Sequence, residues 1–226
     1  MDDKPIILDL CGGTGSWSRF YREDPHYKVI VVDPGEWGNT EPVSGAERLV
    51  MDVRDFAYEL TAACEEESWC VRGLYLHNTR GILAAPPCTH FSRSGARWWE
   101  QKGEEVLIEA LSVVEACLRI VDDLRPCWWC LENPAGRLRW FLGDPTTIIQ
   151  PHHFAGYAED PETQRYTKMT LLWGDFSLPE RRNAEPIRVC AQGSWVQKLG
   201  GKSDKTKRLR SMTPEGLAKA FYVANP

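Results

Sequence analysis

Apolar runs alternate with helix-like segments along the first two thirds of the chain, which is typical of a parallel β-sheet wound with helices. The runs are short, and several of them end in Asp or Pro, as buried strands often do. Five strands are predicted over residues 5–10, 28–33, 47–52, 81–87 and 127–132, and two more at 146–150 and 168–174. The predicted fold class is therefore α/β, with a mostly parallel twisted sheet.

The longest helix is predicted over residues 103–124, where apolar side chains recur at helical spacing and form one stripe. The stripe consists of Val106, Ala110, Val113, Val114, Cys117, Ile120 and Val121. Shorter helices are predicted from Ser16 onward and over residues 56–64. A last helix is expected to run to Val223, with Thr213 as its N-cap and Pro214 in its first turn.

The composition indicates a globular protein with one sizeable core. The 226 residues are 42% hydrophobic and 26% charged, and no apolar run approaches the roughly 20 residues of a membrane helix. The sequence starts with acidic residues and enters a strand at once. We therefore expect neither a secretory signal nor a membrane partner.

The eight cysteines lie mostly in or beside apolar stretches rather than at the spacings of a disulfide framework, which favours a reducing, cytoplasmic setting. Cys127 and Cys130 form one Cys-x-x-Cys pair, but the chain lacks a second pair with zinc-binding spacing. His152 and His153 have no third ligand spaced to join them. We interpret the cysteine pair as buried packing and expect no metal.

Positive charge is concentrated in one part of the chain. Between Gln164 and Arg210 there are eleven Lys and Arg against four Asp and Glu, a local charge of +7 in a chain of formal net charge −5. Residues 175–212 also lack clear hydrophobic periodicity. A basic segment on an acidic body suits a polyanion, although charge alone does not separate that role from a solvated loop.

The stretch "LDLCGGTGSWS" (8–18) indicates a strand, a glycine turn and the start of a helix, an arrangement that brings backbone N–H groups close to a charged ligand. The dinucleotide pattern Gly-x-Gly-x-x-Gly fails, because Ser18 stands where a glycine is needed. Asp9, Asp33 and Asp52 end three successive predicted strands. One such residue would be an ordinary cap, whereas three favour a nucleotide-type site with Asp33 on ribose hydroxyls and Asp52 on an adenine amine.

The stretch "ILAAPPCTHFSRSG" (82–95) places Cys88 directly after two prolines that must end a buried strand. The next predicted strand ends in Leu131-Glu132-Asn133-Pro134. Because adjacent parallel strands lie roughly 4.8 Å apart, Cys88 and Glu132 are expected to face one cleft. A thiolate nucleophile beside a protonated carboxylic acid is what a cytosine ring needs for substitution at carbon 5.

These residues, in this order, resemble the motifs of the DNA cytosine-5 methyltransferases. The family's Pro-Cys-x-x-Phe-Ser is matched by Pro87, Cys88, Phe91 and Ser92. Its Glu-Asn-Val is matched by Glu132 and Asn133, with Pro134 in place of Val. Its first motif, Asp-x-Phe-x-Gly-x-Gly, is matched loosely by Asp9, Gly13 and Gly15, with Cys11 where Phe is usual.

Three later motifs extend the resemblance over nearly the whole chain. Gln164, Arg165 and Lys168 partly match the family's Gln-x-Arg-x-Arg. Residues 208–221 resemble the motif Arg-x-Leu-Thr-x-Arg-Glu, and "ANP" stands near the terminal Gly-Asn segment. The recognition region between these motifs is only about 35 residues long, which is similar to the short members of the family found in phages and prophages.

The resemblance implies a Rossmann-like methyltransferase fold that binds S-adenosylmethionine and yields S-adenosylhomocysteine. The expected regions are a catalytic domain at 1–174, a reduced basic recognition region at 175–210 and a C-terminal helix at 211–226 that packs back on the first. Implied catalytic residues are Cys88, Glu132, Arg165 and Lys168. Implied cofactor-binding residues are Asp9, Leu10, Cys11, Gly13, Gly15, Asp33, Asp52 and Pro86.

The implied partner is DNA, with duplex expected, in a bacterial or phage-infected cytoplasm, and the protein is expected to be a monomer. A base inside a duplex cannot reach Cys88, so base flipping is implied. Candidate DNA-binding residues are Ser92, Arg93, Ser94, Arg97, Lys202, Lys205, Lys207 and Arg208. The first four are equally compatible with a plain polar loop. Packing is favoured over base stacking for Trp98 and Trp99, although either is open. A short basic loop reads few base edges, so a short or relaxed target sequence is expected.

Two alternatives stay open. One is a catalytically idle methyltransferase-like protein that binds DNA, which the truncated recognition region favours and the intact Cys88 and Glu132 oppose. The other keeps the chemistry but acts on RNA or a free deoxycytidine nucleotide. The basic stretch favours a polymer, and the failed glycine spacing disfavours a nicotinamide oxidoreductase.

Overall fold

The computed structural model describes residues 4–35, 43–187, 194, 199 and 203–226. Its main sheet has the strand order β3-β2-β1-β6-β7-β9-β8. These strands are β1 (Ile6–Leu10), β2 (Lys28–Asp33), β3 (Glu47–Val50), β6 (Thr79–Ala84), β7 (Trp128–Pro134), β8 (Thr147–Ile149) and β9 (Thr170–Asp175). A small hairpin of β4 (Cys70–Val71) and β5 (Leu74–Tyr75) stands apart from the main sheet.

The first five strands of the sheet are parallel, while β9 runs antiparallel to both β7 and β8. If the sheet strands are counted in chain order, neighbours follow the order 3-2-1-4-5-7-6 with the seventh strand reversed. This is the arrangement of the Rossmann-like S-adenosylmethionine-dependent methyltransferases. The predicted fold class is confirmed, including the predominance of parallel strands.

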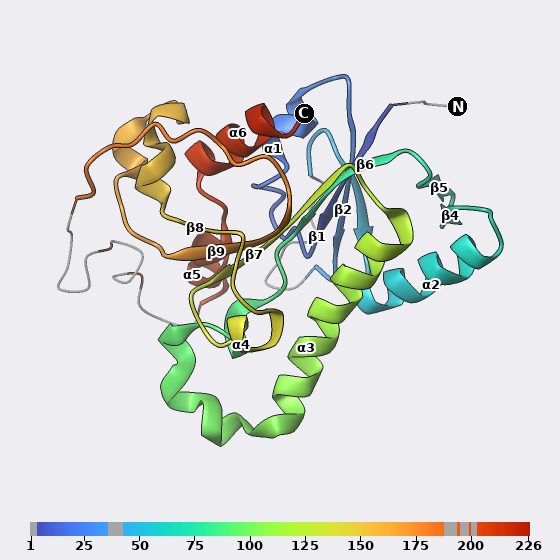
Figure 1. Cartoon of the computed structure of the whole chain (residues 1–226), viewed down its shortest axis with the longest axis horizontal. Helices are drawn as coiled ribbons and strands as arrows, with labels where there is room; N and C mark the ends of the chain where they lie inside the picture. Colours follow the sequence, from blue (N-terminus) through green and yellow to red (C-terminus); the bar gives the residue numbers. More distant parts are fainter. Residues whose placement is uncertain (1–3, 36–42, 188–193, 195–198, 200–202) are drawn as a thin grey trace.

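Helices cover both faces of the sheet, which is why its strands read as nearly continuous apolar runs (Figure 1). One face packs against α2 (Val53–Glu65) and α3 (Trp99–Leu124), and the other against α1 (Arg19–Glu23) and α6 (Glu215–Ala224). Alternate residues of β1 supply the two cores: Ile6, Leu8 and Leu10 on the first face and Ile7 on the second.

Several predicted boundaries shift for identifiable reasons. The third strand ends at Val50, so Asp52 is not a strand end but the N-cap of α2. α3 begins at Trp99 and contains a break at Gly103, whose φ of 76° explains why the helical pattern starts there. β7 continues to Pro134, which pairs with Thr170 of β9 beyond the end of β6. Proline is tolerated there because the β6 side of the strand is already unpaired.

The C-terminal helix contributes to the core on the second face of the sheet, and its predicted N-cap is wrong. The N-cap of α6 is Pro214, while the backbone N–H of Thr213 donates to Ser16 Oγ at 2.9 Å. The Tyr21 hydroxyl of α1 donates to the Asn225 carbonyl at 2.7 Å, which fixes the chain end against the first helix. Cys127, predicted to be buried, is exposed because it precedes β7 at the amino edge of the sheet.

The segment before α6 contains one further helix, α5 (Asp204–Ser211), in a stretch where the sequence shows no clear periodicity. A short helix, α4 (Arg139–Leu142), follows β7. Lys202 lies outside the described residues. None of the helices in the described ranges is long and apolar enough to span a membrane.

Candidate active site

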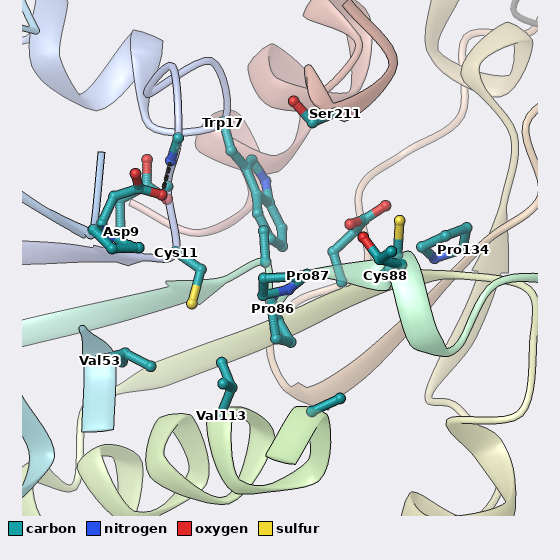
Figure 2. Close-up of a pocket in the computed structure, with 18 of the residues that line it drawn as sticks. Asp9, Cys11, Trp17, Val53, Pro86, Pro87, Cys88, Val113, Pro134 and Ser211 are labelled. Atoms are coloured by element: carbon teal, nitrogen blue, oxygen red, sulfur yellow. Dashed lines mark hydrogen bonds between the residues drawn. The ribbon is translucent and has the colours of Figure 1, made fainter. Parts of the chain in front are cut away.

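A cavity of about 470 Å³ opens at the carboxyl ends of β1, β2, β6 and β7, where open parallel sheets bind their ligands. Figure 2 shows Asp9 and Cys11 at one end of it and Cys88 and Pro134 at the other. Apolar side chains of α2 and α3, including Val53 and Val113, form its floor. The residues at the end of α5 and just after it, Arg210, Ser211 and Thr213, complete the lining.

The turn after β1 is held by Asp9, which is 1% exposed. Its Oδ2 accepts a hydrogen bond from Ser18 Oγ at 2.5 Å, while its buried Oδ1 has no partner in the described part of the chain. Burial raises the pKa of Asp9 to about 6, although the Ser18 bond and the charge of Arg22 lower it. A Cβ atom on Gly12 would lie 2.6 Å from Asp9 Cγ, so only glycine permits this close turn.

Asp33 lines the cavity, but protein groups already occupy its carboxylate. Oδ2 accepts from the backbone N–H of Gly13 at 2.9 Å, and Oδ1 accepts from the N–H of Gly35 at 2.9 Å. The Arg48 guanidinium lies 3.2 Å from the same Oδ1. The geometry therefore ties the glycine turn to the end of β2.

Asp52 also lines the cavity, but as an ordinary helix cap. Its Oδ1 accepts from the N–H of Arg54 at 2.8 Å, and the Arg54 guanidinium pairs with both oxygens at 2.7 and 2.9 Å. These bonds, and first the side-chain bond from Arg54, hold the pKa of Asp52 below its usual value. The structure therefore shows Asp52 as the N-cap of α2.

The other predicted cofactor positions divide into two groups. Cys11, Gly13 and Pro86 line the cavity. Leu10 and Gly15 do not: the Leu10 side chain is fully buried in the core, and its carbonyl accepts from Ala85 N–H at 3.0 Å. Gly15 is likewise buried, and its carbonyl accepts from Arg22. For these two residues the structure does not support the predicted contact.

Cys88 and Glu132 lie on the same wall of the cavity. β6 ends at Ala84, and Pro86 and Pro87 carry the chain into a 3-10 turn, Cys88–His90. The last residue of β7 to pair with β6 is Leu131, so Glu132 is the next residue beyond the end of β6. Asn133, fully buried, donates from Nδ2 to the Pro86 carbonyl at 2.9 Å and fixes the two segments together.

The two groups perturb one another. The surrounding protein raises the pKa of the Cys88 thiol through desolvation, although the cavity leaves its surface accessible, and the charge of Glu132 adds to the rise. Lys168 and Arg210 act in the opposite direction. Desolvation also raises the pKa of Glu132, and Lys168 again opposes it. A carboxyl group in this setting holds its proton to a higher pH than an exposed one.

Of the two basic residues predicted to be catalytic, only Lys168 lines the cavity. Its Nζ donates to the Arg210 carbonyl at 3.2 Å, which links the segment before β9 to α5. Arg165 lies elsewhere: its guanidinium bonds Glu162 at 2.8 and 2.9 Å and the Glu185 carbonyl at 2.8 Å. The catalytic assignment of Arg165 is therefore not supported, because neighbouring loop residues satisfy its charge.

The predicted DNA-binding residues flank the cavity mouth in two groups. Ser92, Arg93, Ser94 and Arg97 lie on or just before the 3-10 turn Arg93–Trp98, where the last three are exposed. Lys205 and Arg208 are exposed on α5, and Lys207 pairs with Asp204 at 3.1 Å. Their contact with DNA stays a prediction, and Lys202 lies outside the described residues.

Trp17 and Arg210 are among the cavity residues that the sequence analysis missed. Trp17, 2% exposed, lies between Asp9 and Pro86 in Figure 2, and its buried Nε1 has no partner in the described ranges. Arg210 is placed beside Cys88 by the end of α5. A tryptophan after a glycine turn looks like a core residue in sequence, and Arg210 is one of many cations in its segment.

No group of three or more potential metal ligands occurs within the described residues. No protein-family model matches the chain, and no curated protein matches it either. One matching solved structure is that of a protein described as a suspected DNA modification methyltransferase encoded within an E. coli prophage. It has 13% sequence identity and a TM-score of 0.47, and the match covers 82% of this chain and 53% of that protein. The chain thus spans about half the length of that protein.

Proposed function

We propose that the protein transfers a methyl group from S-adenosylmethionine to carbon 5 of cytosine in DNA. The observation that carries this proposal is the pairing of Cys88 with Glu132 on one wall of a cavity whose other end is the Asp9–glycine turn. The first pair supplies a nucleophile and an acid, and the turn supplies a site for a second, charged ligand. The motif resemblance in the sequence supports the same chemistry.

The cavity fits S-adenosylmethionine on three observations. Its volume of about 470 Å³ lies in the usual range for small-molecule sites, roughly 300–1,000 Å³. Two residues that line it, Asp9 and Trp17, each have a buried polar atom, Oδ1 and Nε1, without a partner in the described part of the chain. Gly12 and Gly13, which have no side chains, line the cavity with their backbone atoms. Asp9 would hold the ammonium group, and Asp33 the ribose.

This placement of the cofactor has a readout that needs no catalysis. Because the pKa of Asp9 is about 6, an ammonium group bound beside it should lower that pKa and release a proton near pH 6. Calorimetry of S-adenosylmethionine binding in two buffers with different ionisation enthalpies measures this release. The same binding with Asp9→Asn should release no such proton, and equal release by both proteins would contradict the placement.

When bound, S-adenosylmethionine supplies an electrophilic methyl group. The Cys88 thiolate adds to carbon 6 of cytosine while Glu132 gives its proton to N3, which makes carbon 5 nucleophilic. S-adenosylmethionine held by Asp9 and Asp33 would supply the methyl group to carbon 5 and leave as S-adenosylhomocysteine. Loss of the carbon 5 proton to water, cleavage of the Cys88–carbon 6 bond and return of the N3 proton to Glu132 complete the cycle.

A polymeric substrate is supported by the cations around the cavity mouth. Lys168 and Arg210 line the cavity itself, while Arg93 and Arg97 are exposed shortly after Cys88 in the chain and Arg208 shortly before Arg210. Such cations bind phosphates whatever the sequence, so affinity should fall steeply with salt. The small recognition region is consistent with a short or relaxed target sequence.

The test is to incubate the protein with S-adenosylmethionine and unmethylated DNA, digest the DNA to nucleosides and measure 5-methylcytosine by mass spectrometry. Cys88→Ala should abolish the product and leave cofactor affinity nearly unchanged. Cys127→Ala removes an exposed thiol just before β7, at the amino edge of the sheet, and should retain activity. Product formation by Cys88→Ala would refute the nucleophile. Absence of product from the wild type with cofactor bound would favour RNA, a free nucleotide or an idle binding protein.

A further inference from the structure

Four aromatic residues lie next to the active-site loop, and three of them are exposed. Trp98, Trp140 and Phe141 are 46%, 70% and 47% exposed, and Trp99 is half-buried beneath Trp140. We call these four residues the aromatic patch. Large aromatic side chains at the surface of a soluble protein commonly mark a binding site when they gather in one place.

The aromatic patch is attached to the loop that carries Cys88. Trp99 and Trp140 pack edge to face with their ring centroids 5.7 Å apart, and the Arg137 guanidinium lies 4.7 Å from the Trp99 ring centroid. Arg137 in turn donates from Nε to the His90 carbonyl at 2.7 Å and from its backbone N–H to the Phe91 carbonyl at 2.9 Å. Trp140 is therefore connected through Trp99 and Arg137 to His90 and Phe91, two and three residues after Cys88.

Cations lie beside the aromatic patch. Between Ser92 and Lys102 three cations stand against one carboxylate, and the Arg97 guanidinium lies 5.1 Å from the centroid of the Trp98 ring. Lys102 donates to the Thr89 carbonyl at 3.0 Å, which ties the start of α3 to the Cys88 turn. Figure 1 shows α4, with Trp140 and Phe141, beside this part of the chain. Aromatic faces beside arginines form the kind of surface on which single-stranded nucleic acids stack their bases.

We propose that Trp140, supported by Trp99 and Phe141, stacks an unpaired base next to the target cytosine, so that single-stranded DNA is bound and modified in preference to duplex. The inference rests on the proposed function for the identity of the polymer, and it replaces the expectation of a duplex partner. In a duplex the bases adjacent to a flipped cytosine stay paired and stacked, and their faces are not free for Trp140. An unpaired strand can present both the cytosine to Cys88 and its neighbour to the patch.

The experiment measures binding of a fluorescein-labelled 15-nucleotide strand with one cytosine, by anisotropy, in a Cys88→Ala background that forms no covalent adduct. Base–aromatic stacking changes affinity by about 5- to 100-fold per base. We expect Trp140→Ala to weaken binding about tenfold and Trp140→Phe to recover most of the loss. Tyr58→Ala is the matched control, because Tyr58 is 76% exposed on α2 and should leave affinity unchanged.

DNA strands that each carry a single abasic site, at successive positions near the cytosine, separate the loss of one stacking contact from a general loss of DNA affinity in Trp140→Ala. At one position the abasic strand should bind wild type and Trp140→Ala equally, because the base that stacks is absent. An equal loss on every abasic strand, or no loss on the intact strand, would overturn the proposal. So would a larger effect on duplex than on single strands, or a change of oligomeric state in Trp140→Ala, which would make the patch a subunit interface.

The anisotropy measurement needs no methyl transfer, so its outcome is separate from that of the proposed reaction. If wild type yields no 5-methylcytosine but Trp140→Ala still weakens binding at one base, the stacking surface stands and the reaction fails. If 5-methylcytosine forms equally fast in duplex and single strands and Trp140→Ala has no effect, the reaction stands and the stacking surface fails.

Discussion

The two ends of the cavity are built in the same way, at the carboxyl ends of parallel strands, but they treat their acidic side chains differently. At the Asp9 end, Asp33 is bonded to Gly13, Gly35 and Arg48, and Asp52 caps α2 and pairs with Arg54. At the Cys88 end, desolvation raises the pKa of Glu132, and Lys168 is the charge that opposes the rise.

This contrast separates two roles for a carboxyl group in one site. A carboxylate whose oxygens accept backbone N–H and guanidinium groups, as in Asp33 and Asp52, fixes the geometry of a turn or a helix end. A carboxyl group desolvated without such partners retains its proton, so it can act as an acid. Asp9 is intermediate, because it has one bond from Ser18, one oxygen without a partner in the described residues and a pKa raised to about 6.

The largest effect is expected from removing the acid. Glu132→Gln keeps the size of the side chain but has no proton to give, so turnover should fall about 10²- to 10⁴-fold while DNA affinity changes little. Single-turnover kinetics and anisotropy binding measure the two quantities. Glu109→Gln is the matched control, since Glu109 also lines the cavity but is exposed on α3. Full activity of Glu132→Gln would show that Glu132 is not the acid, and the proposed difference between the Cys88 end and the Asp9 end of the cavity would be wrong.

The next effect concerns stability at the Asp9 end. A pKa raised to about 6 in the folded state means that ionising Asp9 opposes folding, so its cost grows as pH rises from about 4 to 6 and is complete above that. Asp9→Asn should therefore raise the free energy of unfolding at pH 7 by up to about 3 kcal/mol, with the gain shrinking below pH 5. Urea unfolding across this pH range measures the difference.

Asp24→Asn provides the opposite sign as a control. The pKa of Asp24 lies below its usual value because the backbone N–H of His26 and the Tyr222 hydroxyl donate to it. Its ionisation thus favours folding, and the variant should be less stable above pH 4. If Asp9→Asn lowers the free energy of unfolding as Asp24→Asn does, the Asp9 carboxylate is stabilised by its hydrogen bonds as those of Asp33 and Asp52 are. Asp9 would then no longer be intermediate between these residues and Glu132.

Much of this arrangement follows from local sequence patterns. The apolar runs gave the strands of the sheet, because strands buried on both faces have little choice of residue type. The prolines after β6 located Cys88 at a strand end, and Glu132 followed from the end of the next strand. Parallel pairing then placed both at one edge of the sheet, which is a topological consequence that needs no knowledge of side-chain packing.

What the sequence could not supply depends on contacts between distant segments. Arg165 and Lys168 are equally plausible in a motif, and only the Glu162 and Glu185 contacts show that Arg165 is used elsewhere. Arg210 reaches the cavity because α5 lies over it, and no periodicity predicts that helix. Asp52 looks like a strand end until the structure shows the strand stopping at Val50 and the helix starting at Val53.

A smaller effect is expected from the basic residue at the Cys88 end. The charge of Lys168 lowers the pKa of both Cys88 and Glu132, so Lys168→Met should move both titrations to higher pH. The rate of Cys88 alkylation by iodoacetamide, followed by peptide mass spectrometry, gives the thiol titration directly. At a given pH below the thiol pKa the variant should react more slowly. Arg165→Met, whose charge is neutralised by Glu162, should react like wild type, and an equal shift in both variants would mean that general charge acts on the thiol.

The smallest effect is expected at Asp52, and it tests whether this carboxylate does more than cap a helix. Asp52→Ser retains a side-chain acceptor for the N–H of Arg54, whereas Asp52→Ala loses it and should cost about 1 kcal/mol of stability. If Asp52 only caps α2, the Ser variant should keep both its melting temperature and its affinity for S-adenosylmethionine. A Ser variant that folds normally but binds the cofactor at least tenfold more weakly would show that the ion-paired carboxylate also accepts a ligand group. In that case, the ion pair with Arg54 would orient the Asp52 carboxylate and leave it able to bind a ligand. The acidic residues at the two ends of the cavity would then differ only in their desolvation.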